Sequence, residues 1–301
     1  MKAAVLFTAT LFAAISAHAA DGDADPTYAG GTVVTQSVPS PFYQSYEPDT
    51  ALAADGSLAV IGAAGTSAYS IATRLAVAKF RSDGAPDYEF GNFGVATVDF
   101  SDGAADYPAY GRSIAALPGG RWLLTGRIGP SPFEIGLARL LPNGQLDLTY
   151  GTLGRARISF SGSEQSVPGE LQVDDEQRAW MLVSRNGGSY LVRLTPDGAL
   201  DASFGDGGKL LLPNTFFVSC FTLDAQGRVL LGGVSFGQNR YDMAVSRLLP
   251  DGRIDTSFGD TGLTLISPDI RASAQQLRLL PDGRIIVAGI SYSSAWRGCR
   301  S

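Results

Sequence analysis

The sequence of 301 residues contains 37 glycines and 16 prolines, and only 17% of its residues are charged. This composition indicates many short elements separated by turns, and it disfavours long surface helices, which need exposed Lys, Glu and Arg. The formal net charge of −6 and the lack of an Arg or Lys cluster exclude the basic surface that nucleic acids bind, so we expect no nucleic-acid partner.

Residues 1–20 have the pattern of a secretory signal peptide. Lys2 supplies the positive start, the run AAVLFTATLFAAI is apolar, and residues 17–19 (Ala-His-Ala) have the small-x-small pattern of a cleavage site. The apolar run is shorter than the ~20 residues that a membrane-spanning helix needs. We therefore expect residues 1–19 to be removed, which leaves an exported protein, periplasmic or extracellular, without a membrane span.

The mature chain then lacks histidine, because His18 is the only one in the sequence. Catalysis by Ser-His-Asp or Cys-His groups and zinc sites built on histidine are therefore excluded. We expect no metal site and no cofactor. Cys220 and Cys299 could form one disulfide in an oxidising compartment or stay as two independent cysteines, and their spacing does not decide between these alternatives.

One motif recurs along the chain at intervals of about 54 to 60 residues, in the range of propeller blades or solenoid units. The copies are DGDADPTYAGG from residue 21, SDGAPDYEFGNFG from 82, PNGQLDLTYGTLG from 142, PDGALDASFGDGG from 196 and PDGRIDTSFGDTG from 250. Each copy is followed by a strand-like run: VVTQSV from 33, VATVDF from 95, RARISF from 155, KLLL from 209 and LTLIS from 263. The later four copies are preceded by an apolar run with a basic residue near its end: LAVAKF from 75, IGLARL from 135, YLVRL from 190 and MAVSRL from 243.

Each repeat also contains a hairpin pattern, two apolar runs joined by a glycine turn. The clearest copies are FTLDAQGRVLLGG from 221 and LRLLPDGRIIVAG from 277, and the weaker ones are LAADGSLAVIG from 52 and IAALPGGRWLLTG from 114. The copy LQVDDEQRAWMLVS from 171 has lost its glycine. Because Asp-Gly supplies the positive φ that a two-residue hairpin turn demands, the pattern predicts four antiparallel strands in each repeat.

The recurring motif itself predicts a structural frame. In PDGRIDTSFGDTG, Asp251-Gly252 reverses the chain, while Gly259 and Gly262 permit backbone conformations closed to other residues. Asp255 is expected to accept hydrogen bonds from nearby backbone amides. An aromatic ring at one repeated position is expected to bury itself against the next repeat; the members are Tyr28, Phe90, Tyr150, Phe204 and Phe258. A basic residue at a second repeated position is expected to pair with the motif aspartates; the members are Lys79, Arg139, Arg193 and Arg247.

Two ligand interpretations of the motif compete with this frame. A calcium loop of the EF-hand type needs alternating oxygen ligands and a final bidentate Glu, which no copy contains. A phosphate cradle needs Gly-x-x-x-x-Gly-Lys-Ser/Thr or Gly-x-Gly-x-x-Gly before a helix, and neither occurs. The motif therefore indicates architecture.

The pairing of LPDGRIIVAG with SRLLPDGRIDTSFGDTG closely resembles the delta-60 repeat family of bacterial exported proteins. The resemblance extends over essentially the whole mature chain. It implies the blades of a β-propeller, and it implies no common enzymatic activity. The chain departs from the family pattern at LQVDDEQRAWMLVS and at the C-terminal AWRGCRS.

The two ends of the mature chain complement each other. It opens with the tail of a repeat, DGDADPTYAGGTVVTQSV, and closes with the head of one, QLRLLPDGRIIVAGISYSSAWRGCRS. We therefore expect residues 20–301 to form an all-β propeller of five four-stranded blades, the last shared between residues 20–38 and 275–301, because closure covers exposed sheet edges. In the alternative, AWRGCRS is a truncated or frame-shifted end and the chain belongs to a longer array.

The segments that differ between repeats lie at the second-to-third strand loops and at the crossings between blades, on the rim opposite the glycine motifs. Binding residues concentrate on such scaffolded loops, and aromatic side chains there suit a sugar or a peptide. We expect a protein or glycan ligand on this face; the candidate binding residues are Tyr43, Tyr46, Tyr107, Tyr110, Phe236, Tyr241 and Trp296. In the alternative, these aromatic side chains fold back over the blade edges.

Two classes of function remain. The first is a non-catalytic exported scaffold that binds a partner. The second is a polysaccharide hydrolase that uses two carboxylates about 5 to 9.5 Å apart; the loop acids are Glu47, Asp106, Glu134, Glu164, Asp242 and Asp269. Nothing distinguishes any pair from ordinary surface acids, so we predict no catalytic residue and prefer the binding scaffold.

Overall fold

The computed structural model describes residues 42–43, 49–65, 72–104, 107–162, 164–185, 188–213, 215–237, 240–266 and 271–292. The predicted signal peptide lies outside these residues. In the described part the chain is all-β apart from one short 3-10 turn, Pro118–Gly120. It divides into two compact units, residues 1–171 (unit 1) and 172–301 (unit 2), and each is described by itself.

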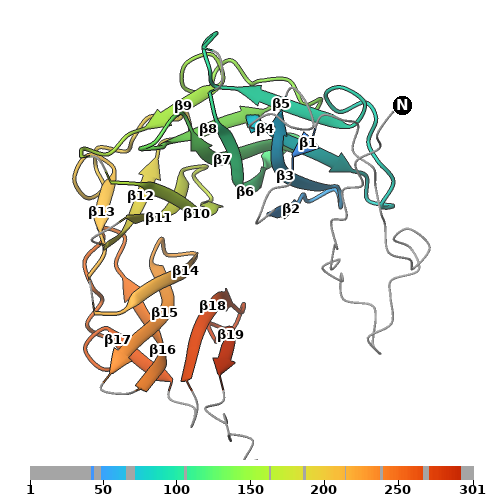
Figure 1. The fold of residues 1–301 in the computed structure, drawn as a ribbon. Helices are drawn as coiled ribbons and strands as arrows, with labels where there is room; N and C mark the ends of the chain where they lie inside the picture. The colour runs from blue at the N-terminus through green and yellow to red at the C-terminus, as the bar shows by residue number, and fades with distance from the viewer. Residues whose placement is uncertain are drawn as a thin grey trace, which may run out of the picture. The chain divides into compact units, whose positions relative to one another are not determined.

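Unit 1 contains two antiparallel sheets (Figure 1). The first comprises β1 (Phe42–Tyr43), β2 (Thr50–Leu52), β3 (Leu58–Gly65), β4 (Ala72–Phe80) and β5 (Val95–Asp99). Both β1 and β2 pair with β3, at different stretches of it, so together they occupy the place of one first strand. The second sheet has the order β6 (Ala109–Leu117), β7 (Arg121–Ile128), β8 (Glu134–Leu140) and β9 (Arg155–Ile158).

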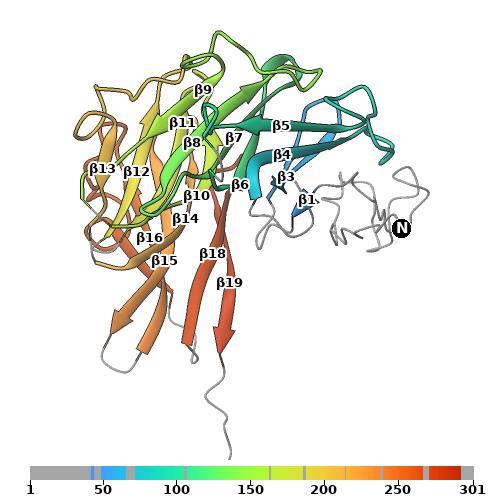
Figure 2. The ribbon, with the colours of Figure 1, turned by 45° about the horizontal axis from the view of Figure 1, so that its top comes forward.

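Unit 2 continues the same pattern. Its first sheet has the order β10 (Ser166–Val173), which begins before the unit boundary, then β11 (Ala179–Arg185), β12 (Gly188–Leu194) and β13 (Lys209–Leu211). The next has the order β14 (Phe217–Leu223), β15 (Val229–Gly237), β16 (Arg240–Leu248) and β17 (Leu263–Ile266). The described part ends with the hairpin of β18 (Arg271–Leu279) and β19 (Ile285–Tyr292), and β18 packs against β14, β15 and β16 (Figure 2).

The predicted fold class is confirmed: the chain is all-β and folds into four-stranded antiparallel sheets like the blades of a β-propeller. The strands after the later four motif copies begin at the predicted residues, Val95, Arg155, Lys209 and Leu263. The run predicted from residue 33 lies outside the described residues. The two partners expected to complete the β18–β19 sheet, residues 20–38 and the chain after residue 292, lie outside the described residues. Closure by the chain ends therefore stays a prediction.

Within each unit, a hydrophobic core lies between neighbouring sheets. In unit 1, Phe90 and Phe100 share a cluster with Trp122 and Leu124, and all four are fully buried. In unit 2, Trp180 and Phe204 meet edge to face with ring centroids 5.0 Å apart. Burial of each such side chain stabilises the fold by about 1.5–3 kcal/mol, so sheet-to-sheet packing provides much of the driving force.

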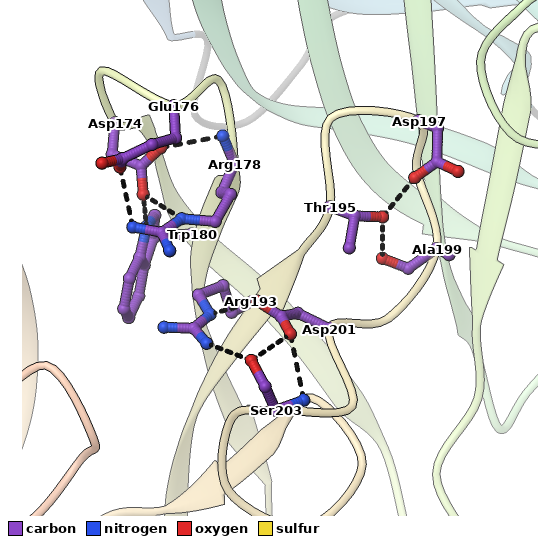
Figure 3. A network of polar contacts seen from close by, with 10 residues as sticks. All are labelled: Asp174, Glu176, Arg178, Trp180, Arg193, Thr195, Asp197, Ala199, Asp201 and Ser203. Atoms are coloured by element: carbon purple, nitrogen blue, oxygen red, sulfur yellow. Dashed lines mark hydrogen bonds and ion pairs between the residues drawn. The ribbon is translucent and has the colours of Figure 1, made fainter.

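The repeated basic residues pair with the motif aspartates, as predicted. The nitrogen–oxygen distances are 2.9 Å for Lys79–Asp87, 2.7 Å for Arg139–Asp147, 2.7 Å for Arg193–Asp201 and 2.8 Å for Arg247–Asp255. Figure 3 shows one copy, in which Asp201 also accepts hydrogen bonds from the backbone and hydroxyl of Ser203. The charged heads lie over the repeated rings, for example Arg193 Cζ at 4.5 Å from the Phe204 centroid. The motif is therefore a structural frame.

The third repeat forms its hairpin without the missing glycine. Gln177 has a φ of 61°, and Gly227 has a φ of 72° at the matching place in the next repeat. The Asp174 carboxylate accepts hydrogen bonds from the Arg178 backbone and side chain and from Trp180 Nε1 (Figure 3). Asp224 accepts the same two bonds from Arg228 in the next repeat, so the Trp180 bond is the one that differs between the two turns. The turn is held by side-chain hydrogen bonds in spite of a strained residue.

Candidate functional site

The predicted site residues fall into three groups. Tyr46 and Trp296 lie outside the described residues, and Tyr43 is described only as backbone, in β1 opposite Ala63. Tyr107 and Tyr110 belong to unit 1, and Phe236 and Tyr241 belong to unit 2.

Phe236 and Tyr241 form a pair at the end of the β15–β16 hairpin. They are directly opposite each other in the strand register, and their rings meet edge to face with centroids 5.3 Å apart. Phe236 is 62% exposed, and Phe217, which is near it in the same unit, is 51% exposed, so two apolar rings are accessible to solvent here. Tyr241 fixes the orientation of the exposed Phe236 ring.

A pocket of about 390 Å³ lies next to this aromatic pair. Three segments of unit 2 line it: the ends of β11 and β12, the crossing from β13 to β14, and the end of β15. The lining residues are Ser184, Arg185, Gly188, Ser189, Pro213, Thr215, Phe216, Phe217, Val218 and Phe236. These segments are a second-to-third strand connection and a crossing between sheets, the two kinds of segment in which the sequence predicted binding residues.

The composition of the pocket suits a small, largely uncharged ligand. Aromatic rings supply apolar surface, and the hydroxyls of Ser184, Ser189 and Thr215 supply hydrogen-bonding groups. Arg185 adds a positive charge. Its effect reaches Lys209 in β13, whose pKa is lowered first by burial and then by the charge of Arg185. None of the described lining residues is an Asp or Glu.

The connection between β11 and β12 is one physical reason for the space. Only residues 186–187 separate these strands, whereas residues 129–133 separate β7 from β8 in unit 1. In that longer connection Ser131 Oγ accepts a hydrogen bond from the Gln165 side chain, which bridges the loop and the following crossing. The short connection between β11 and β12 has fewer residues that could cover the crossing from β13 to β14, which leaves space there.

Tyr107 in unit 1 takes part in a polar network on a blade edge. Its hydroxyl accepts a hydrogen bond from Arg157 Nη1 at 2.7 Å, and Arg157 also binds Asp102 at 2.7 Å. The Arg157 guanidinium lies 5.5 Å from the Tyr107 ring centroid and 5.6 Å from that of Phe100. The pKa of Arg157 is raised: its burial lowers the pKa, and its contacts with Tyr107 and Asp102 outweigh this effect. Tyr107 therefore covers the blade edge here.

Tyr110 has a different surrounding. Its ring meets that of Phe133 edge to face at 6.4 Å, and Arg127 lies between the loop and the strand with its guanidinium carbon 5.7 Å from Tyr110 and 5.0 Å from Phe133. Arg127 is not among the residues that the sequence analysis selected. A signal was present, because a charge occurs at a position that is uncharged in the other repeats.

The structure describes three of the candidate carboxylates, Glu134, Glu164 and Asp242. Glu47, Asp106 and Asp269 lie outside the described residues. Of the rest, Glu134 forms an ion pair with Arg157 at 3.6 Å, and Asp242 is buried. In the described part no group of three or more His, Cys, Asp or Glu side chains could hold a metal ion.

Two further sequence expectations concern the chain as a whole. Cys220 is buried in β14, and Cys299 lies outside the described residues, so the alternatives for the two cysteines stay open. Among the described residues no helix is long and apolar enough to cross a membrane.

The repeated four-stranded antiparallel sheets define a protein of the β-propeller class. In agreement with this class, the family model described as a domain of unknown function (DUF5122) beta-propeller matches residues 53–90, 182–204 and 226–258. No curated protein was found that is a sequence relative of the chain.

Solved structures resemble the fold at low identity. A protein from Lactobacillus plantarum is 13% identical with a TM-score of 0.50, and the match covers 87% of this chain and 69% of that one. An α-L-arabinanase from Penicillium chrysogenum, solved with arabinobiose, is 11% identical with a TM-score of 0.46 over 83% of this chain and 90% of its own. A protein of unknown function from Dyadobacter fermentans is 14% identical with a TM-score of 0.43 over 84% of this chain and 77% of its own. The likeness to the first concerns the fold alone, and the two lower scores support no conclusion about this chain.

Proposed function

We propose that this protein is an exported, non-catalytic β-propeller that binds a glycan in the pocket formed by the end of the β11–β12 hairpin, the crossing into β14 and Phe236. The observation that carries this proposal is the exposed Phe236 ring, oriented by Tyr241, at the mouth of a pocket of about 390 Å³. This volume falls within the roughly 300–1,000 Å³ of small-ligand sites.

A glycan fits this surface for two reasons. The exposed face of an aromatic ring can pack on the apolar face of a sugar ring, and the hydroxyl and guanidinium groups around it can pair with sugar hydroxyls. Hydrolysis through two carboxylates would need acids on both sides of the bond, and the described lining of the pocket contains none. Recognition without turnover is therefore the better account of this pocket.

Two attributes of the proposal rest on the sequence. Export is supported by the charged, apolar and small-x-small pattern of residues 1–20. Assignment of the repeats to the delta-60 type is supported by the recurrence of PDGRIDTSFGDTG and LPDGRIIVAG. Mass spectrometry of the secreted protein tests export, since the mature chain should begin near residue 20.

The binding proposal is tested on a glycan array with the mature protein and two variants. Phe236→Ala removes the exposed ring and should abolish or weaken binding at least ten-fold. The matched control is Tyr88→Ala, which removes another highly exposed ring, in unit 1, and should leave binding unchanged. Chromogenic polysaccharides give the second readout. Binding that survives Phe236→Ala contradicts the proposed pocket, and release of dye contradicts the non-catalytic assignment.

A further inference from the structure

Arg127 packs against two aromatic rings of unit 1, which also contact each other. It stands near the end of β7, directly opposite Tyr110 in the strand register, and its guanidinium carbon is 5.0 Å from the Phe133 ring centroid. The Tyr110 centroid is 5.7 Å away on β6. Two rings from different segments therefore restrict the orientation of the guanidinium, and the cation–π contacts stabilise it.

The donors of Arg127 are not used by the described part of the protein. Its Nε is buried and has no hydrogen-bond partner, and no described carboxylate or carbonyl pairs with its guanidinium. Other arginines of unit 1 differ in this respect: Arg139 binds Asp147, and Arg155 and Arg157 both bind Asp102. Glu134, the acid next to Phe133, is paired with Arg157. Buried polar groups are normally satisfied, so an unsatisfied donor calls for an explanation.

Arg127 does not belong to the repeated frame. In four of the sheets, one residue lies opposite the last residue of the following strand. These equivalent residues are Trp122 in β7, Leu58 in β3, Ala179 in β11 and Val229 in β15. Counting five residues onward, Arg127 corresponds to an uncharged residue in every case: Ala63, Ser184 and Val234. A charged residue that stabilises the repeated motif recurs in the other repeats, as Arg139, Arg193 and Arg247 do. Among the compared sheets, a charge at the position of Arg127 occurs once.

We propose that Arg127 is the anchor of a second ligand site, which takes the carboxylate of a small organic acid. The planar fork of a guanidinium matches a carboxylate with two parallel hydrogen bonds, and contact with the two rings limits the positions that the fork can take before a ligand binds. The net charge of −6 disfavours a polyanion, whose approach would be repelled, so a ligand with a single carboxylate is the better fit. The site does not depend on the pocket of unit 2.

The test is a titration of the mature protein followed through the Arg127 side-chain N–H signal by NMR. The probes are sodium glucuronate, N-acetylglycine and, as the neutral comparison, glucose. A saturable shift with a carboxylate and none with glucose is the expected result. Response to glucuronate alone assigns the carboxylate to a sugar acid, and response to N-acetylglycine alone assigns it to an amino-acid or peptide source. No saturable shift with either probe overturns the proposal.

Variants then tie the binding to Arg127. Arg127→Gln should weaken carboxylate binding at least ten-fold, and Arg127→Lys should do the same, because a lysine keeps the charge and loses the fork. Arg253→Gln, at an exposed arginine, is the matched control and should bind as wild type does. Should Arg127→Gln fail to fold, Arg127→Lys decides alone. Phe236→Ala should leave this binding intact, which separates it from the proposed glycan pocket. Unchanged affinity in Arg127→Lys and Arg127→Gln overturns the proposal.

Discussion

Arg193 donates a hydrogen bond from Nε to Asp201 Oδ2 at 2.7 Å, and both residues are buried, at 6% and 9% exposure. The same basic–acidic pair, eight residues apart, recurs in three other repeats. A buried charge is tolerated only when it is paired, so the recurrence explains why the motif keeps its aspartate.

Removal of one partner of this pair should therefore be costly. Arg193→Ala leaves Asp201 buried and uncompensated and should lower the free energy of unfolding by about 3–5 kcal/mol. Urea denaturation measures this change. Arg253→Ala is the control, because its pair with Asp251 is exposed, at 79% and 50% of the two side chains, and should change stability by about 0.5 kcal/mol or less. Equal losses in both variants would contradict the structural role of the buried pair.

The pairs should also set the acid limit of stability. The Ser203 hydroxyl, the Ser203 amide and the Arg193 charge hold the pKa of Asp201 below its usual range, against the opposing effect of burial. In Asp147, burial raises the pKa, and contacts with Thr149 and Arg139 outweigh it, so the net direction is again down. A carboxylate with a lowered folded pKa contributes stability that is complete above about pH 4 and is lost as the pH falls through the folded pKa.

Ser203→Ala tests this linkage. Loss of the hydroxyl should move the pKa of Asp201 back toward its usual value, so the variant should be less stable than the wild type above about pH 4. The difference should shrink as the pH falls further, because protonated Asp201 no longer depends on the hydrogen bond. Urea midpoints measured across the acidic range give the comparison. A difference that is independent of pH would show that the hydroxyl acts through packing instead.

The turn at Gln177 offers a reciprocal pair of substitutions. Gln177 has a positive φ of 61° and Gly227 occupies the matching turn at 72°. Gln177→Gly should relieve backbone strain and raise the free energy of unfolding by about 0.5–1 kcal/mol, and Gly227→Gln should lower it by about 1–2 kcal/mol. Thermal and urea unfolding measure both. A loss of stability in Gln177→Gly would mean that the side chain itself stabilises the turn.

Gly233 connects backbone packing to the proposed pocket. A Cβ at this position would lie 1.8 Å from the carbonyl oxygen of Phe217, a residue that lines the pocket. Gly233→Ala should therefore force β14 away from β15, with a loss of about 1–3 kcal/mol, and should weaken glycan binding as well. Ser235→Ala on the same strand adds no atom and is the control. Wild-type stability in Gly233→Ala would show that the two strands separate without cost.

Much of the fold followed from local patterns in the sequence. Glycine at fixed positions and alternating apolar runs predicted the strands, and charge recurrence predicted the pairing of Lys79, Arg139, Arg193 and Arg247 with motif aspartates. These features act over a few residues, so their consequences can be derived without the rest of the chain. The two strands assigned to the ends of the chain remain predicted, since they lie outside the described residues.

The candidate sites were less accessible from sequence. Phe236 and Tyr241 were selected as loop aromatics, but their edge-to-face contact depends on the register of β15 with β16. Tyr107 looked equivalent in sequence, and its contact with Arg157 came from a strand fifty residues later. Arg127 was missed because the lack of a hydrogen-bond partner for its Nε depends on the residues that pack around it, which the sequence does not show.

The sequence by itself determined the repeat, the strand order within the three four-stranded sheets and the ion pair at four of the motif copies, because hydrogen bonding and side-chain alternation are local in the chain. Only the tertiary structure decided that a pocket lies beside β11 and β12 at the start of β14, and that two rings contact Arg127. The pocket and the unsatisfied Arg127 Nε both depend on distances between segments that are far apart in the sequence. No single stretch of residues specifies those distances.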